Sequence, residues 1–279
     1  MLRIAVPNKG ALSEIAAEYL KEAGYNGRRD PKELIVADPK NGVEFFYLRP
    51  RDIATYVGSG ALDVGITGRD LLIDSGSNAH EVAPLGFAVS TFRFAGPAGQ
   101  FGSVEELAGK RLATSYTGLV GDFLAGRGVQ VELVKLDGAV ESAIRLGVAD
   151  AIADVVETGS TLRKQGLEIF GEPLLRSEAV LIAGPSEAEG FDTLYRRLQG
   201  VMVARQYVLM DYDLPAELLE QATAIAGGME SPTVSPLRDP AWVAVRVMIP
   251  RDRINDIMDS LYTLGARAIL VTPIHAARL

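Results

Sequence analysis

The stretch AIADVVETGSTLRKQG, residues 151 to 166, brings carboxylates and small hydroxylated residues together at the end of a predicted strand. Its apolar start predicts a strand, and the following turn predicts a helix whose first N–H groups lack backbone partners. The loop would offer those N–H groups and hydroxyl donors to a phosphate: Thr158, Gly159, Ser160 and Thr161. Asp150, Asp154 and Glu157 would repel a free phosphate, whereas carboxylates suit the hydroxyls of a ribose. The stretch therefore predicts a site for a phosphorylated ribose.

A plainer interpretation of the same stretch is a helix N-cap formed by Thr158 or Ser160. Such a cap contributes about 1 kcal/mol and needs one hydroxyl, not several. The surplus of hydroxyls favours a ligand site over a cap.

Basic residues follow two other predicted strands. Lys9, between Asn8 and Gly10 in AVPNKGAL, comes after the first strand, and Arg49 ends the strand in FFYLRPRD. The carboxyl ends of strands in an α/β sheet face the ligand, where lysine neutralises phosphate and arginine binds it bidentately. The alternative is an exposed surface cation, which weighs equally for Lys9 and for the nearby Arg51 and less for Arg49.

Three further candidates come from similar strand ends. Asp70 follows LDVGITG, whose Gly65 and Gly68 would keep a cleft wall free of side chains. Tyr116 follows RLATS and could stack on a base, with a core tyrosine as the rival interpretation. Glu141 follows VELVKLDGAV as a carboxylate facing the cleft or as a helix N-terminal acid.

The sequence offers no protein-made metal cage. His80 and His275 lie far apart without a metal-ligand spacing, and there is no cysteine. A metal would instead be Mg²⁺ bridging substrate phosphates with one or two carboxylates, so the metal ligands themselves stay unassigned.

Composition limits the class of protein. The formal net charge of −8 disfavours a nucleic-acid partner. No apolar run approaches the roughly 18 residues that span a bilayer, which predicts no membrane partner. MLRIAVPNKG enters a strand pattern without a signal-peptide core, and the lack of cysteine suits a reducing compartment. A soluble cytoplasmic protein is expected.

The order of elements predicts an α/β fold with two lobes and a small terminal domain. Short apolar runs alternate with helical stretches up to about residue 205, which predicts mostly parallel sheets. Chain crossings near GFAVSTFRFAGP and FGEPLLRSEAVLIAGP would join two lobes as in periplasmic binding proteins. We expect lobe I at 1–90 and 179–205, and lobe II at 91–178. The β-α-β-β-α-β order of 206–279 predicts a ferredoxin-like domain.

Taken together, these segments resemble the ATP phosphoribosyltransferase family in its long form, the first enzyme of histidine biosynthesis. The resemblance extends over the whole chain and rests on VPNKGAL, FFYLRPRDIATYVGSGALDVGITGRDLL, RLATSY, LDGAVE, GVADAIADVVETGSTL and ESPTVSPL. It implies a two-lobed catalytic unit with an ACT-like regulatory domain, ATP and 5-phosphoribosyl 1-pyrophosphate as substrates, and Mg²⁺. It also implies feedback inhibition by histidine and a homodimer or homohexamer.

The resemblance assigns roles to particular residues. The phosphoribosyl pyrophosphate site would comprise Asp154, Glu157, Thr158, Gly159, Ser160, Thr161 and Leu162. The ATP site would comprise Lys9, Gly10, Arg49, Asp70 and Tyr116, and the catalytic groups would be Lys9, Arg49 and Glu141. TGLVGDFLAG after Tyr116 departs from the family pattern of a proline with basic residues nearby, so triphosphate contacts from this segment stay open.

The implied histidine site would lie in the terminal domain, at Asp213, Ser231, Thr233 and Ala268. A carboxylate would receive the ammonium group, and hydroxyl or backbone donors would receive the carboxylate. Ordinary turn chemistry at a strand edge explains each residue equally well when it is taken alone.

Two other classes compete with the enzyme. A non-catalytic two-lobed solute-binding protein would bind one ligand per cleft without consuming it, but it does not explain a combined phosphate and ribose site. A purely regulatory amino-acid sensor leaves Lys9, Arg49 and residues 154–162 without a role.

Overall fold

The computed structural model describes residues 1–156 and 159–278, which form two compact units. One unit, here called the two-lobed unit, contains residues 1–21 and 25–191. The other, the terminal unit, contains residues 22–24 and the chain from residue 192 onward. Each is described by itself.

The first lobe is built on a six-stranded sheet of order β2-β3-β1-β4-β11-β5. Its strands are β1 (Leu2–Pro7), β2 (Ile35–Asp38), β3 (Val43–Leu48), β4 (Val64–Gly68), β5 (His80–Pro84) and β11 (Ala179–Ala183). The strand β1 pairs in parallel with β3 and β4, while the remaining pairs are antiparallel. Every residue of β4 is buried, as expected for a central strand covered on both faces.

Three helices belong to this lobe: α1 (Ala11–Glu22), α2 (Pro50–Gly58) and α3 (Arg69–Ser75). The helix α1 is amphipathic and buries Ala16, Tyr19 and Leu20 against the lobe. Pro50 is the first residue of α2 and Arg49 is its N-cap, as the fixed φ of proline favours.

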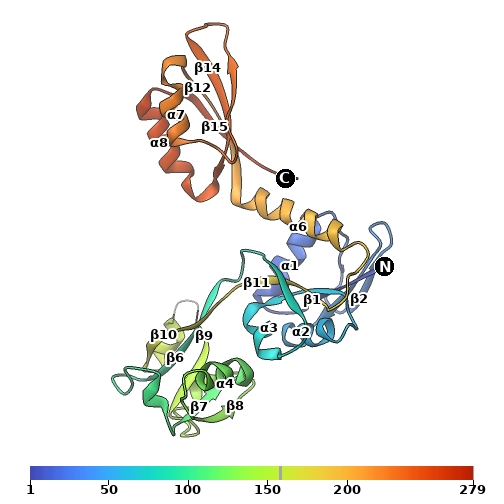
Figure 1. Ribbon diagram of the computed structural model, residues 1–279, viewed down its shortest axis with the longest axis vertical. Coiled ribbons are helices and arrows are strands. Elements are labelled where there is room, and N and C mark those ends of the chain that lie inside the picture. Colours follow the sequence, from blue (N-terminus) through green and yellow to red (C-terminus); the bar gives the residue numbers. More distant parts are fainter. Residues whose placement is uncertain (157–158, 279) are drawn as a thin grey trace. The chain divides into compact units, whose positions relative to one another are not determined.

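The second lobe is built on a five-stranded sheet of order β10-β6-β9-β7-β8. Its strands are β6 (Ser90–Pro97), β7 (Arg111–Thr114), β8 (Glu132–Lys135), β9 (Ala151–Val156) and β10 (Leu167–Ser177). Its helices are α4 (Thr117–Ala125) and α5 (Ser160–Lys164), with the 3-10 turns η1 (Glu105–Leu107) and η2 (Val140–Ser142). Figure 1 shows α4 beside β7 and β8.

The chain passes between the two sheets twice, at residues 85–89 and at Glu178. The expectation of mostly parallel sheets is wrong, because both sheets are mixed. Parallel neighbours need a crossover segment of a dozen or more residues, which the short connection between β2 and β3 does not supply. The α/β class and the two-lobed arrangement are confirmed.

The terminal unit starts with the long helix α6 (Phe191–Gln206), which runs directly into β12 (Tyr207–Pro215). There follow η3 (Ala216–Leu218), α7 (Leu219–Ile225), β13 (Thr233–Pro236), β14 (Trp242–Pro250), η4 (Arg251–Arg253), α8 (Ile254–Leu264) and β15 (Arg267–Pro273). The sheet is antiparallel with the order β13-β14-β12-β15, and α7 packs beside α8 (Figure 1). This is the predicted ferredoxin-like arrangement, which is confirmed.

Among the described residues, no helix combines the length and apolar character that a membrane crossing requires.

Candidate active site

A hollow of about 400 Å³ lies in the second lobe, where β9 ends. It is lined by Glu141, Asp154, Val155, Val156, Gly159, Ser160, Thr161 and Leu162. The predicted loop therefore borders an open cavity, and Glu141 reaches the same cavity from η2. Glu157 and Thr158 fall outside the described residues.

The loop geometry explains how small residues come to line this hollow. Gly159 is the N-cap of α5 and adopts φ +68°, a left-handed conformation that glycine accepts without steric cost. Ser160 and Thr161 are exposed, whereas Leu162 packs into the core of the second lobe and anchors the helix. The N-cap position is thus taken by a glycine, so a side-chain cap by Ser160 does not explain the loop.

Asp154 lies on the wall of the hollow with its carboxyl group largely removed from water. Burial raises its pKa above the ordinary range of an aspartate, and the negative charges of Glu141 and Asp70 act in the same direction. A hydrogen bond from the Val155 N–H, at 2.8 Å, and the charge of Arg51 oppose this rise. The carboxylates of the two lobes therefore form one electrostatic cluster that a donor-rich or cationic ligand would relieve.

Asp70 joins the first lobe to the second crossing of the chain. Its side chain is buried, and Ser177 Oγ donates to Asp70 Oδ1 at 2.7 Å while accepting from the Asp70 N–H at 3.1 Å. After burial, the negative charge of Asp70 is the next cause that raises the pKa of the Tyr116 hydroxyl group. The fold therefore brings Asp70 and Tyr116 near each other across the two lobes.

Tyr116 combines features of both interpretations offered by the sequence. Its ring meets Phe92 edge-on, with 5.0 Å between ring centroids, and burial raises the pKa of its hydroxyl group. The Arg51 guanidinium lies over the ring, 4.7 Å from its centroid. The Tyr116 ring therefore packs against Phe92 in the core, and one of its faces contacts the Arg51 guanidinium.

Lys9 and Arg49 lie side by side because their strands are neighbours. Pro7 pairs with Leu48 in the parallel ladder, and the Asn8 N–H donates to the Leu48 carbonyl at 2.8 Å. Both cationic side chains are exposed, and neither forms an ion pair with any described residue. Gly10, at φ +76°, turns the chain into α1. The turns after β1 and β3 therefore place two positive charges, neither paired with a described acid, at the same edge of the sheet.

Some partners escaped the sequence analysis. Asp74 pairs with Arg51, at 2.7 Å between Oδ2 and Nη1, and stands one helical turn after Asp70. The spacing of four residues between Asp70 and Asp74 places both on one helix face, and it could have marked Asp74 as a candidate site residue. Ser177 carried no signal, because its role depends on a crossing that brings β10 to α3.

Asp150 does not belong with the acids of the hollow, contrary to the sequence interpretation. It accepts hydrogen bonds from the Arg111 N–H at 2.9 Å and from Arg111 Nη2 at 2.8 Å. This ion pair lowers the pKa of Asp150 to about 2. The Asp150 carboxylate therefore binds Arg111 just before β9 begins, where β9 pairs with β7.

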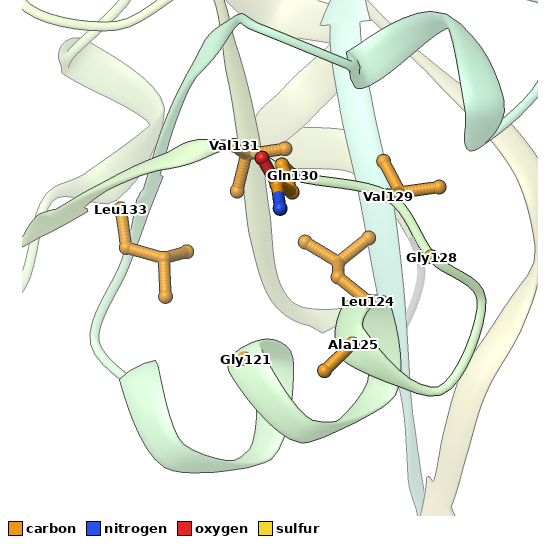
Figure 2. A pocket seen from close by; sticks show the side chains of 8 residues that line it. All are labelled: Gly121, Leu124, Ala125, Gly128, Val129, Gln130, Val131 and Leu133. Atoms are coloured by element: carbon orange, nitrogen blue, oxygen red, sulfur yellow. The ribbon is translucent and has the colours of Figure 1, made fainter.

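A second hollow in the same lobe has a different character. It measures about 520 Å³ and lies between α4 and the segment leading into β8 (Figure 2). Its lining is Gly121, Leu124, Ala125, Gly128, Val129, Gln130, Val131 and Leu133. Gln130 supplies the polar side chain of this set, and none of the eight is charged. These eight side chains therefore offer no charged group to a phosphate.

The four candidate residues of the terminal unit divide into two pairs on opposite sides of its sheet, and Asp213 lies on the interior strand β12. Thr233 lies on β13 and Ala268 on β15, with β14 and β12 between them. At roughly 4.8 Å per strand, these edges are about 14 Å apart. Asp213 pairs with Arg267 beside the irregularity that contains Ala268, whose φ of +50° is left-handed, and Ser231 precedes β13. Within one chain, Asp213 and Ala268 are neighbours, and Ser231 and Thr233 form a separate pair.

No cluster of three or more His, Cys, Asp or Glu suited to a metal ion occurs among residues 1–156 and 159–278. Glu141 and Asp154 are two carboxylates on one hollow. This donor set fits Mg²⁺ that arrives on a phosphate ligand and takes one or two protein oxygens.

Comparisons with known proteins identify the family of the chain. A family model described as ATP phosphoribosyltransferase matches residues 49–200, and one described as HisG, C-terminal domain, matches residues 204–276. The chain is 66% identical over 286 residues to an ATP phosphoribosyltransferase of Arthrobacter sp. strain FB24, with 100% of each chain covered. It is 63% identical over 285 residues to one of Streptomyces avermitilis, again with 100% of each covered.

A solved structure of an ATP phosphoribosyl transferase (HisG:HisZ) complex from Thermotoga maritima matches with a TM-score of 0.64 and 29% identity. The match covers 72% of this chain and 98% of that one.

Proposed function

The chain belongs to the ATP phosphoribosyltransferase family, and from this membership we propose which of its residues perform the family's reaction. The enzyme is a pentosyltransferase of histidine biosynthesis. It joins adenine N1 of ATP to the anomeric carbon of 5-phosphoribosyl 1-pyrophosphate and releases pyrophosphate.

The hollow at the end of β9 is the observation that carries the assignment of the phosphoribosyl site. Ser160 and Thr161 supply donors for the 5-phosphate, and Gly159 lets the backbone approach it. Asp154 accepts hydrogen bonds from the ribose hydroxyls. A neutral hydroxyl donor suits a carboxylate that already lies near Glu141 and Asp70, because it adds no further negative charge.

Lys9 and Arg49 are the proposed neutralising groups for pyrophosphate and triphosphate oxygens. Their exposure and their lack of ion-pair partners in the described part of the chain leave both charges available to a ligand. Arginine can bind a phosphate through two parallel hydrogen bonds, which lysine cannot do. Asp70 and Tyr116 are the proposed neighbours of the adenine.

The chemistry demands positioning more than proton transfer. Adenine N1 already carries a lone pair, so no base is needed to create the nucleophile. As the C–O bond to pyrophosphate breaks, negative charge grows on the leaving group and positive charge grows on the sugar. Lys9 and Arg49 stabilise the first, and the carboxylates of Glu141 and Asp154 stabilise the second.

Mg²⁺ is proposed as the metal, with Glu141 and Asp154 as the protein oxygens that would hold it beside the substrate. When bound, it neutralises phosphate charge that the two free cations alone leave uncompensated. ATP and the phosphoribosyl donor are metabolites of the cytoplasm, which is the proposed location.

Histidine is the proposed inhibitor of the terminal unit, with Asp213 and Ala268 on the neighbouring strands β12 and β15, and with Ser231 and Thr233 at the opposite edge of the sheet. A single small ligand does not bridge about 14 Å across one sheet. If all four residues contact one histidine, two copies of the chain must each contribute one edge. This supports a homo-oligomer, a dimer or a hexamer.

The reaction can be tested directly. Pure protein is mixed with ATP, phosphoribosyl pyrophosphate, Mg²⁺ and pyrophosphatase, and the absorbance of the adduct is followed with and without histidine. Adduct formation that requires both substrates is expected. Binding of either substrate without any adduct would instead favour a solute-binding protein and reject the proposed roles.

A further inference from the structure

We propose that Asp74 is a positioning residue for the nucleotide side of the active site, acting through Arg51 and Tyr116. The inference rests on the proposed place of Tyr116 beside the adenine. Asp74 itself is not proposed to touch substrate.

The Asp74 carboxylate is shared between two partners. Its Oδ1 accepts the backbone N–H groups of Gly118 and Leu119, at 2.9 and 3.1 Å. Its Oδ2 accepts from Arg51 Nη1 at 2.7 Å. One side chain on α3 of the first lobe thus caps the start of α4 in the second lobe and holds Arg51 at the same time.

The electrostatics favour this arrangement over a solvated surface aspartate. Asp74 stands in the last turn of α3, where its own helix disfavours a negative charge. The backbone N–H groups at the start of α4 and the Arg51 guanidinium both stabilise the negative charge of Asp74 and so reverse that preference. The Asp74 side chain is only 11% exposed, so the interaction is less screened than that of an open surface pair.

The packing at this point leaves no room for adjustment. A Cβ added at Gly118 would lie 2.7 Å from the Asp74 carbonyl oxygen, closer than real Cβ contacts. The two helices therefore approach closely only because residue 118 is glycine. This close approach of α3 and α4 keeps the Asp74 carboxylate within hydrogen-bonding distance of the Gly118 and Leu119 N–H groups.

The consequence falls on Tyr116. Arg51, held by Asp74, covers its ring, with 4.7 Å from the guanidinium carbon to the ring centroid. The short helix α3 therefore fixes one face of the ring through Asp74. Loss of Asp74 frees Arg51 and lets the start of α4 move, and Tyr116 is the N-cap residue of that helix.

The test compares Asp74→Ala, which removes both interactions, with Asp74→Asn, which keeps an oxygen for the two N–H groups but loses the charge that holds Arg51. Asp122→Asn, an exposed acid on α4, is the matched control. For Asp74→Ala we expect the KM for ATP to rise about tenfold, as for loss of a charge-assisted hydrogen bond. The KM for phosphoribosyl pyrophosphate and the kcat should stay within about threefold, and Asp74→Asn should fall between wild type and Asp74→Ala.

Amide hydrogen exchange supplies a readout that does not depend on turnover. Exchange at Gly118 and Leu119 should quicken about tenfold in Asp74→Ala and remain near wild type in Asp74→Asn. Quickened exchange with an unchanged KM for ATP would overturn the proposal, since Asp74 would then be only a helix cap. An equal rise in the KM for both substrates would overturn it as well.

Arg51→Gln provides a second route if Asp74→Ala does not fold, because Arg51 is exposed and its loss leaves the cap intact. It should raise the KM for ATP without quickening exchange, and the Arg51→Gln/Asp74→Asn double variant should add little to the single one. Additive effects would contradict the proposal. Wild-type turnover is measured first, so that its absence would count against the proposed function, while the exchange data still decide whether Asp74 caps α4.

Discussion

The cations and the carboxylates of the candidate active site are held in opposite ways. Lys9 and Arg49 lie on turns at the edge of the first sheet, exposed and without ion-pair partners in the described residues. Asp70, Asp74 and Asp154 are at least partly buried, and each accepts hydrogen bonds from the protein.

This difference suggests a division of labour. The anchored acids fix the shape of the sugar and adenine sites before a ligand arrives, which lowers the cost of ordering them. Free cations on turns can follow phosphate groups whose positions change as pyrophosphate leaves. The charges without protein partners and the charges held by the protein therefore lie on different elements of the candidate site.

The largest effect is expected from the free cations. Arg49→Ala should lower kcat/KM about a hundredfold or more, because a charge that stabilises the leaving group is lost, and Lys9→Ala should follow the same direction. Steady-state kinetics with both substrates measures this, with Lys40→Ala as the exposed control. Melting temperatures should hardly change. Retained turnover with a lowered melting temperature would show that these cations are structural.

Asp154→Asn should lower kcat/KM by roughly tenfold to a hundredfold, as expected when a charged acceptor is lost. The same substitution should increase the stability of the folded protein at neutral pH. Because the pKa of Asp154 is raised in the folded protein, its contribution to stability is present at low pH and is lost as the pH rises through the folded pKa. The variant should therefore be more stable than wild type at neutral pH. Thermal melts across pH would contradict this if Asp154→Asn were destabilised throughout.

In the terminal unit, Asp213→Ala should raise the histidine concentration needed for half inhibition about tenfold, since an acceptor for the ammonium group is removed. Uninhibited turnover should stay near wild type. Inhibition curves at fixed substrate concentrations measure the shift. A parallel loss of turnover would show that Asp213 supports the fold instead.

The smallest effect is expected from Asp150→Asn, the acid at the other end of β9. Turnover should not change, because Asp150 faces Arg111 and not the hollow. The ion pair contributes stability above the unfolded pKa, and that contribution fades as the pH falls toward about 2. Denaturation at neutral and acidic pH should show a slight loss only at neutral pH. A large loss of activity would show that Asp150 does belong to the candidate active site.

Much of this molecule could be predicted from local patterns. The helix at Pro50, the left-handed turn at Gly159 and the terminal β-α-β-β-α-β order follow from propensities and periodicities that act over a few residues. The neighbourhood of Lys9 and Arg49 also follows, once their strands are assumed to be parallel neighbours.

The partners of the acids could not be predicted in this way. Asp150 and Asp154 stand four residues apart in one stretch, yet one meets Arg111 across a strand pair and the other borders the hollow. Nothing in their local sequence separates them, because the distinction depends on which strand lies alongside. The same holds for Ser177, which reaches Asp70 only after the chain has completed the second lobe.

The sequence by itself determined the class of fold, the residue types at each strand end and the family to which the chain belongs. The tertiary structure alone decided which charges are free and which are held, and it separated the candidate histidine residues into two pairs on opposite sides of one sheet. The physical reason is the range of the interactions: backbone preferences and capping act within one or two turns, whereas burial and ion pairing join residues more than a hundred positions apart, as at Asp70 and Ser177.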